Sequence, residues 1–208
     1  MAVITSIVAK KRDKNRFLVY IDNQFACILN DFSIFKYKLK EGKEITENEL
    51  SNIQLECEQD IAFDLAIKYL SKYTKTEKEV KDYLISKGYL PSVVKEVMQK
   101  IKNYGYINDE SLAKTYTSMS KNKYGKNKIK FMLKTKGISE ENIDKALSEL
   151  ESQEDAVYEL AIKHLKNKEK NKENLQKTSK FLYGRGFSWE DISKTLSKIS
   201  KEWEDESW

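Results

Sequence analysis

The first 30 residues carry short apolar runs separated by polar turns. The apolar runs fall at 3–8, 17–21 and 25–29, and the turn-like segments at 11–15 and 22–23. Alternation of this kind, rich in Val, Ile and Phe, is typical of β-strands. The pattern predicts a three-stranded meander, which is too small to be stable alone and must pack on another part of the chain.

Helical periodicity begins near Asp31 and dominates from Thr46 onward, and this part of the chain repeats itself. Gly88, Gly137 and Gly186 each follow Lys or Arg, at a spacing of 49 residues (88 to 137 to 186). Apolar residues recur four positions before, six after and thirteen after each glycine: Leu84, Leu133 and Leu182; Val94, Ile143 and Ile192; Ile101, Leu150 and Ile199. Such self-similarity indicates tandem supersecondary units.

Each repeat is predicted to contain three helices. The first helices are expected near 57–71, 109–120 and 154–168. The second helix of each repeat ends at its glycine, which can adopt the left-handed backbone that closes a helix. The third begins at a Pro or Ser suited to a helix start. These turns are assigned to Gly88, Gly105, Gly137 and Gly186, and the third helices to starts at Pro91, Ser139 and Ser188.

The predicted fold is mainly α, with three tandem three-helix repeats in an elongated curved array and a small N-terminal β-containing part. The expected divisions are an N-terminal β-meander with a helical extension (1–56) and three three-helix repeats (57–105, 106–151 and 152–208), the last of which includes an acidic tail. Repeats of this kind contact mainly their neighbours and present a concave surface. Residues 203–208, acidic with an aromatic residue at each end, are interpreted as a frayed tail in preference to a segment that docks on a partner.

The composition narrows the class of protein. One Pro and seven Gly in 208 residues favour helix, and no stretch approaches the roughly 18 apolar residues of a spanning helix. The start has no secretion signal, so we expect a cytoplasmic protein without a membrane partner. Cys27 and Cys57 lie too far apart in sequence to suggest a disulfide framework or a zinc site.

Signals of catalysis are poor. His164 is the single histidine, which excludes a cluster of histidine metal ligands, and no phosphate-binding glycine loop is present. Residues 63–70 and 158–165 are similar in sequence, and this similarity aligns His164 with Tyr69. We therefore expect the His164 side chain to be half-buried. We therefore expect no catalytic residue, no metal and no cofactor.

The charges are strongly segregated, although the net charge is only +5. Residues 111–139 contain no Asp or Glu, and 140–161 are acidic. Within the first segment, Lys126, Lys130 and Lys134 are spaced to share one helix face, where like charges repel. The candidate binding residues for a phosphate backbone or an acidic protein surface are Lys121, Lys123, Lys126, Lys128, Lys130 and Lys134.

Two interpretations of these lysines remain open. In one they contact phosphates, with Tyr116, Tyr124 or Phe131 available for base stacking, although Tyr116 and Phe131 are expected to belong to the core. In the other they pair with Glu140, Glu141 and Asp144 on the next helix. A sequence-specific helix-turn-helix is disfavoured, because those acids would occupy the recognition positions and repel phosphates.

Several segments resemble the RecX regulatory family. Residues 104–113, Tyr-Gly-Tyr-Ile-Asn-Asp-Glu-Ser-Leu-Ala, are similar to a Gly-Tyr-Ile-Asp-Asp-x-x-Phe-Ala segment of that family, and 133–138 to its Leu-x-x-Lys-Gly-Ile segment. The resemblance covers roughly residues 57–200. Asn108 and Leu112 depart from the family pattern, which usually has Asp and Phe there.

The resemblance implies a protein without a catalytic site that binds RecA recombinase filaments and inhibits their ATP hydrolysis and strand exchange. The 49-residue repeat and the near absence of Pro lead us to expect a monomer, and the basic segment leaves direct contact to single-stranded DNA open. The runner-up is a nucleic-acid-binding module without a RecA partner. A metal-dependent nuclease is the third class, against which the missing ligand pattern argues.

Overall fold

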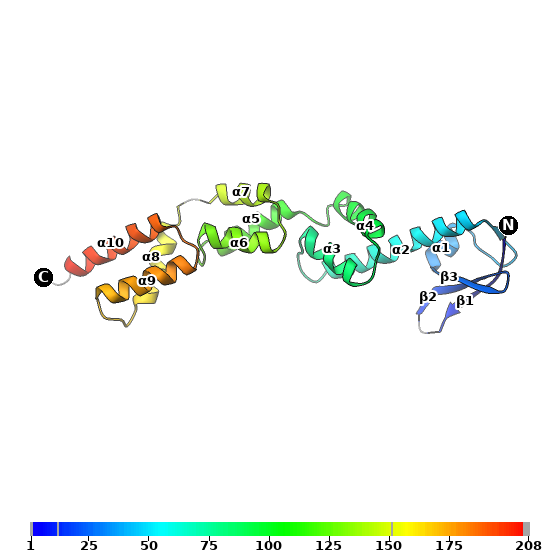
Figure 1. Cartoon of the computed structure of the whole chain (residues 1–208), viewed down its shortest axis with the longest axis horizontal. Coiled ribbons are helices and arrows are strands. Elements are labelled where there is room, and N and C mark those ends of the chain that lie inside the picture. The colour runs from blue at the N-terminus through cyan, green and yellow to red at the C-terminus, as the bar shows by residue number, and fades with distance from the viewer. Residues whose placement is uncertain (1, 12, 151, 206–208) are drawn as a thin grey trace. The chain divides into compact units, whose positions relative to one another are not determined.

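The computed structural model describes residues 2–11, 13–150 and 152–205. Figure 1 shows the strands and helices in chain order. Contacts divide the chain into two compact units. The first comprises Met1–Lys75 with Val80–Ile107, and the second comprises Thr76–Glu79 with Asn108–Trp208. A small β-containing part is followed by three tandem three-helix units, as the repeat predicts.

The strands form an antiparallel sheet of order β3-β2-β1-β4. Its strands are β1 (Ala2–Lys10), β2 (Asp13–Ile21), β3 (Gln24–Asn30) and β4 (Glu44–Ile45). Asp22 and Asn23 both have positive φ, as a tight hairpin between twisted strands requires. The meander prediction omitted β4, because two residues are too short to produce a pattern in sequence.

Helix α1 (Asp31–Lys36) follows β3, and α2 (Glu47–Leu70), which follows β4, is one continuous helix. The prediction placed the first long helix at 57–71, which is wrong by ten residues at its start. Thr46 and Glu49 cap α2 reciprocally, each side chain bonding the other's backbone N–H. The first half of α2 buries Ile53 and Cys57 against the sheet. The second half belongs to the first three-helix unit.

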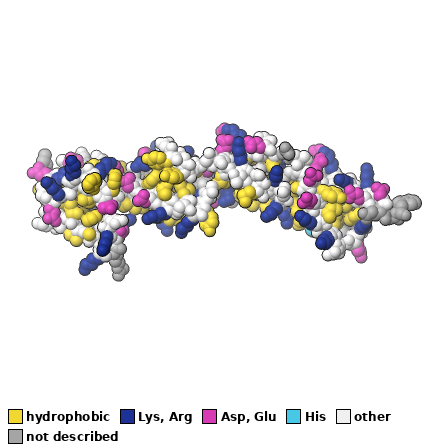
Figure 2. All heavy atoms as spheres, turned by 180° about the vertical axis from the view of Figure 1, so that it is seen from behind, with side chains coloured by type: hydrophobic (Ala, Val, Ile, Leu, Met, Phe, Trp, Pro, Cys, Tyr) yellow, Lys and Arg dark blue, Asp and Glu magenta, His cyan; other side chains and the backbone are white. Residues whose placement is uncertain are grey.

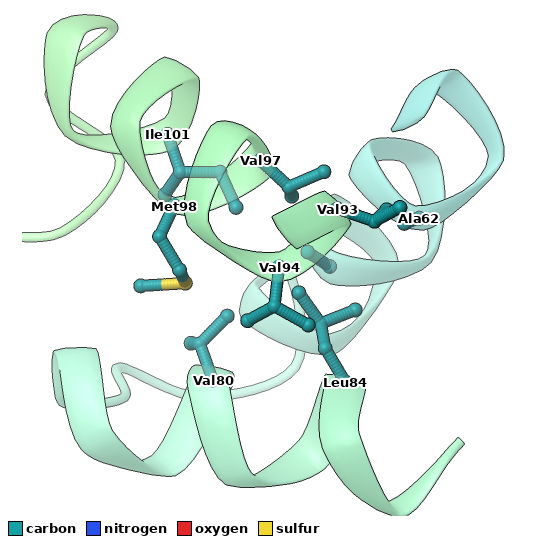
Figure 3. Packing of buried hydrophobic residues seen from close by; sticks show 9 residues of the cluster. Ala62, Val80, Leu84, Val93, Val94, Val97, Met98 and Ile101 are labelled. Atoms are coloured by element: carbon teal, nitrogen blue, oxygen red, sulfur yellow. The ribbon is translucent and has the colours of Figure 1, made fainter. Parts of the chain in front are cut away.

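That first three-helix unit is completed by α3 (Glu77–Ser86) and α4 (Pro91–Asn103). Figure 3 shows side chains from the three helices meeting in one core. Leu84 and Val94, both repeat positions, are at most 1% exposed there. The buried members are Ala62, Ala66, Val80, Leu84, Val93, Val94, Val97, Met98 and Ile101.

The second of the two compact units contains two further three-helix sets, which are the second and third repeats. The first set is α5 (Asp109–Ser120), α6 (Lys126–Thr135) and α7 (Glu140–Ser148), and the second is α8 (Glu154–Leu165), α9 (Lys172–Gly184) and α10 (Trp189–Asp205). Each has its own apolar core. Gly88, Gly137 and Gly186 have φ of +89°, +82° and +84°, and follow α3, α6 and α9.

The C-terminal end of the last helix differs from the prediction. Trp203 packs against the core of the last three-helix set, and α10 continues to Asp205. The interpretation of residues 203–205 as a frayed tail is therefore wrong, because the ring of Trp203 has apolar partners. The remainder of that predicted tail, 206–208, lies outside the described residues.

Candidate nucleic-acid interface

The acid-free segment 111–139 folds into most of α5, the turn after it and α6. Lys121 caps the C-terminus of α5, and Lys123 lies in the turn. Gly125 caps the N-terminus of α6, which carries the other candidate lysines. All six candidates are exposed or partly exposed, so folding leaves their charges accessible to solvent.

Two lysines of the predicted stripe are paired within the fold. Lys130 Nζ lies 2.8 Å from Asp144 Oδ1 on α7, and Lys134 pairs with Glu140. The hydrogen bond from Lys130 to Asp144 raises the pKa of the lysine, and the one from Lys134 lowers the pKa of Glu140. The repulsion between these two lysines is therefore offset by carboxylates on α7.

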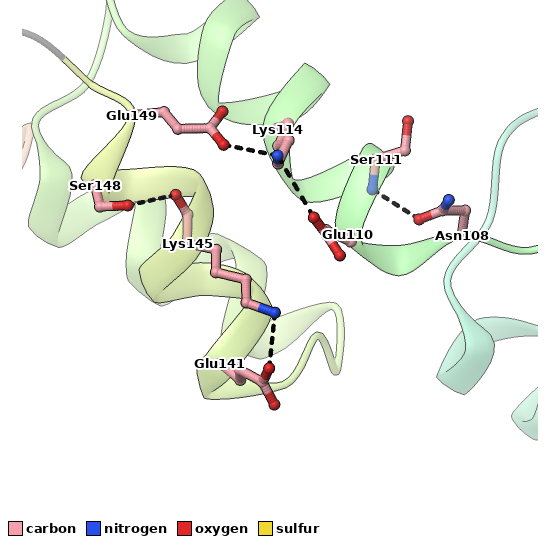
Figure 4. Close-up of polar contacts among 8 residues, drawn as sticks. All are labelled: Asn108, Glu110, Ser111, Lys114, Glu141, Lys145, Ser148 and Glu149. Atoms are coloured by element: carbon pink, nitrogen blue, oxygen red, sulfur yellow. Dashed lines mark hydrogen bonds and ion pairs between the residues drawn. The ribbon is translucent and has the colours of Figure 1, made fainter.

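Two other lysines of the segment are paired as well. Lys114 Nζ contacts Glu149 at 2.6 Å and Glu110 at 3.4 Å, as Figure 4 shows. Lys136 Nζ lies 3.1 Å from Glu79 Oε1. Charges of both signs are interspersed on the molecular face seen in Figure 2. The basic composition of the segment therefore overstates its free positive charge.

The remaining candidates behave differently. Lys121, Lys123 and Lys128 form no ion pair with any carboxylate in the described part of the chain, and Lys126 donates to the carbonyl oxygen of Leu150 at 3.3 Å. The ammonium of Lys128 lies 5.5 Å from the centroid of the Phe131 ring. Phe131 is 63% exposed, so its assignment to the core is wrong. Tyr116 does pack on the core of this three-helix set.

A glutamine that sequence reasoning missed holds the turn between α5 and α6. The Gln153 side chain donates to the carbonyl oxygens of Lys121 at 2.7 Å and Tyr124 at 3.0 Å. Its Oε1 accepts from the backbone N–H of Lys126 at 3.2 Å. Gln153 is 8% exposed, and it satisfies backbone groups at two helix ends that would otherwise lack partners. Nothing about an isolated Gln in the sequence indicates this role.

The same turn contacts the glycine turn between α9 and α10. Gly125 N–H donates to Arg185 O at 3.0 Å, and Asn127 N–H donates to Gly186 O at 3.2 Å. Arg185 donates back to the carbonyl oxygen of Lys123 at 3.2 Å. A Cβ on Gly125 would lie 2.2 Å from Gly186 O, so the two backbones meet where only glycine fits. Arg185 was absent from the predicted site residues.

His164 is partly buried, as its alignment with Tyr69 predicts. Its ring stacks on Phe181, and Nδ1 lies 2.9 Å from Thr178 Oγ1. Burial, together with Lys168 and Arg185, lowers the pKa of the imidazole. Within the described residues, no group of three or more His, Cys, Asp or Glu side chains is arranged to hold a metal ion. No helix among them is long and apolar enough to span a membrane.

The chain matches four family models in succession along its length. They describe the N-terminal domain of regulatory protein RecX (residues 2–46) and its first, second and third three-helix domains (62–100, 108–147 and 151–196). The regulatory protein RecX of Clostridium tetani is 34% identical over 76% of this chain and 74% of its own length. The chain belongs to the RecX family.

Other RecX proteins are similar over a smaller share of their length. The Bacillus velezensis and Bacillus subtilis proteins are 35% and 34% identical over 71% of this chain, which corresponds to 57% of either relative. A crystal structure of regulatory protein RecX matches 95% of the chain with a TM-score of 0.73 and 26% identity. That of RecX from Lactobacillus salivarius matches 68% with a TM-score of 0.63.

Proposed function

We propose that this RecX-family chain regulates the RecA recombinase by binding RecA filaments assembled on single-stranded DNA and inhibiting their ATP hydrolysis and strand exchange. The observation that carries the proposal is the succession of matches to the N-terminal and three helical RecX domains between residues 2 and 196. In this proposal the chain is a cytoplasmic monomer without catalysis of its own, active in recombination and DNA repair.

The physical basis is the addition of weak contacts. Tandem units joined in one chain bind a repetitive partner with high effective concentration once the first unit is bound. Binding that favours one filament state withdraws subunits from the ATPase cycle, because a ligand shifts an equilibrium by its differential affinity for the two states. No reacting group on the chain is needed for that effect.

The test is the ATPase rate of RecA from the same organism on preassembled filaments, with and without the chain. We expect the rate to fall at near-stoichiometric or lower amounts of the chain. The measurement is repeated with single-stranded DNA in large excess. Inhibition that persists supports binding to the filament. Inhibition that disappears indicates competition for DNA and favours the alternative of a nucleic-acid-binding module without a RecA partner.

A further inference from the structure

The second unit contains two turn contacts related by the 49-residue repeat. In one, the residues at the start of α3 meet the turn after α6, where Thr76 Oγ1 donates to Lys136 O at 2.8 Å. In the other, the start of α6 meets the turn after α9, where Gly125 N–H donates to Arg185 O at 3.0 Å. Thr76 and Gly125 are 49 residues apart, as are Lys136 and Arg185.

One difference in charge between the two contacts concerns the residue that pairs with the cation of the glycine turn. At the first, the cation of the turn, Lys136, is neutralised by Glu79 at 3.1 Å. The residue 49 positions after Glu79 is Lys128. At the second contact a carboxylate is thus replaced by an ammonium, and Arg185 has no acidic partner among the described residues.

Lys128 and Arg185 reach the same place in the fold. The backbone and Cβ of Lys128 lie so close to Gly186 that a Cβ on that glycine would be 2.5 Å from Lys128 Cβ. Lys123 lies at the same contact, because Arg185 donates a hydrogen bond to its backbone carbonyl oxygen. Three residues with cationic side chains, none with a carboxylate partner in the described part of the chain, therefore lie at one turn contact, and an anion bound there would offset the repulsion among their charges.

We propose that Lys123, Lys128 and Arg185 form a binding site for the phosphodiester backbone of single-stranded nucleic acid. The guanidinium is held in orientation, because it lies 4.6 Å from the Phe181 ring centroid and 5.8 Å from that of Tyr124. A planar guanidinium fixed in this way suits two phosphate oxygens. The site specifies how the chain contacts the DNA of a RecA filament, and in that respect it rests on the proposed function.

An exposed aromatic ring beside Lys128 favours a single strand over other anions. Phe131 is 63% exposed with Lys128 Nζ 5.5 Å from its centroid, so a base stacked on that ring would place its phosphate near the ammonium. In a duplex the bases are already stacked on each other and unavailable to the ring. An acidic protein surface would fill the cationic cluster but leave Phe131 without a partner.

The most direct test places the acidic residue of the first contact at the equivalent position of the second. Lys128→Glu installs the acid found at the equivalent position 79, which is expected to pair with Arg185 as Glu79 pairs with Lys136. The melting temperature should be kept while affinity for a fluorescent oligo-dT, measured by anisotropy without RecA, falls by about tenfold or more. The slope of log affinity against log salt should flatten by about 0.7 for each phosphate that the variant no longer binds.

A matched pair of neutral variants controls for net charge. Lys128→Gln and Lys130→Gln remove one charge each from the same helix, but only Lys130 has an acidic partner among the described residues. We expect the first to weaken oligo-dT binding and the second to leave it nearly unchanged. Equal effects of the two variants, or unchanged binding in Lys128→Gln, would overturn the proposed site. This comparison tests the site even if Lys128→Glu does not fold.

Competition identifies the ligand. Duplex DNA and poly-glutamate should compete with oligo-dT less well than unlabelled oligo-dT does; equal competition by either would refute a single-strand site. The assay contains no RecA, so it fails independently of the proposed function. Binding of oligo-dT through Lys128 without any effect on the RecA ATPase would support the proposed site and contradict the proposed regulation of RecA. Inhibition of RecA without oligo-dT binding at low salt would support the regulation of RecA and overturn the single-strand site.

Discussion

The imidazole ring of His164 stacks on the ring of Phe181, with centroids 4.3 Å apart and planes 13° from parallel. In the first three-helix unit, Tyr69 stacks on Tyr83 in the same manner, at 4.0 Å and 8°. Tyr83 and Phe181 each lie five residues before a turn glycine. The first and third three-helix units thus share a stack of two rings between their first and second helices, with His164 in the place of Tyr69.

This relationship predicts a pH-dependent term in stability. Because the pKa of His164 is lowered in the folded chain, the unfolded chain binds the proton more tightly. The stabilising contribution is present above the unfolded pKa of about 6.5 and is lost as pH falls through the lower folded value. His164→Tyr, which restores the residue of the first unit, should keep the stack and show a smaller loss of stability between about pH 7.5 and 5.5. Urea unfolding at several pH values measures it, and equal slopes would contradict it.

The close approach of Gly125 to Gly186 predicts a steric effect. Gly125→Ala places a methyl group against a backbone carbonyl, so the second unit should lose about 1–3 kcal/mol of stability. Gly184→Ala is the control, because no heavy atom beyond its own neighbourhood lies within 4 Å of its Cβ position. That change should be neutral or stabilising by up to about 1 kcal/mol. Similar melting temperatures for the two variants would refute the prediction.

A backbone effect without a steric one is expected at Gly88. Its φ is +89°, and nothing lies within 4 Å of its Cβ position. Gly88→Val should destabilise the first unit by about 1–2 kcal/mol because a β-branched residue resists the left-handed region. Gly88→Asn should cost less, since Asn tolerates that region. Thermal unfolding of both variants gives the comparison, and a more stable Val variant would contradict it.

Gln153 offers a test of the hydrogen bonds that hold the cationic turn. Gln153→Leu removes three hydrogen bonds and leaves two carbonyls and one N–H at helix ends without that partner. A loss of about 1–3 kcal/mol is expected, since unsatisfied buried polar groups are costly. Amide hydrogen exchange should accelerate at Lys126. Protection equal to that of the unmodified chain would show that water replaces the side chain without cost.

The pair between Lys130 and Asp144 is expected to contribute little to stability. Both side chains are well exposed to solvent, so a double-mutant cycle should give a coupling of about 0.2–1 kcal/mol that decreases with salt. RecA inhibition should be unaffected by Lys130→Gln. Strongly reduced inhibition by this variant, at unchanged stability, would restore the stripe on α6 as the interaction surface.

The sequence by itself determined the local structure. Leu84, Leu133 and Leu182 are all fully buried, because helical periodicity places them on the face that must leave water. The turn glycines follow from backbone sterics, and the helix starts at Pro91 and Ser139 from unpaired N–H groups at a helix end. Each of these depends on neighbours a few residues away, so a single chain displays them.

Tertiary structure decided which charges remain free. Lys128 and Lys130 are two positions apart in one acid-free segment, yet of the two only Lys130 meets a carboxylate of the described residues, because α7 packs on one side of α6 and the glycine turn of Arg185 on another. The role of Gln153, the position of Trp203 and the continuity of α2 likewise depend on contacts far apart in sequence. Periodicity gives the face a residue occupies but not the residue that will lie opposite, since that is set by how separate helices pack.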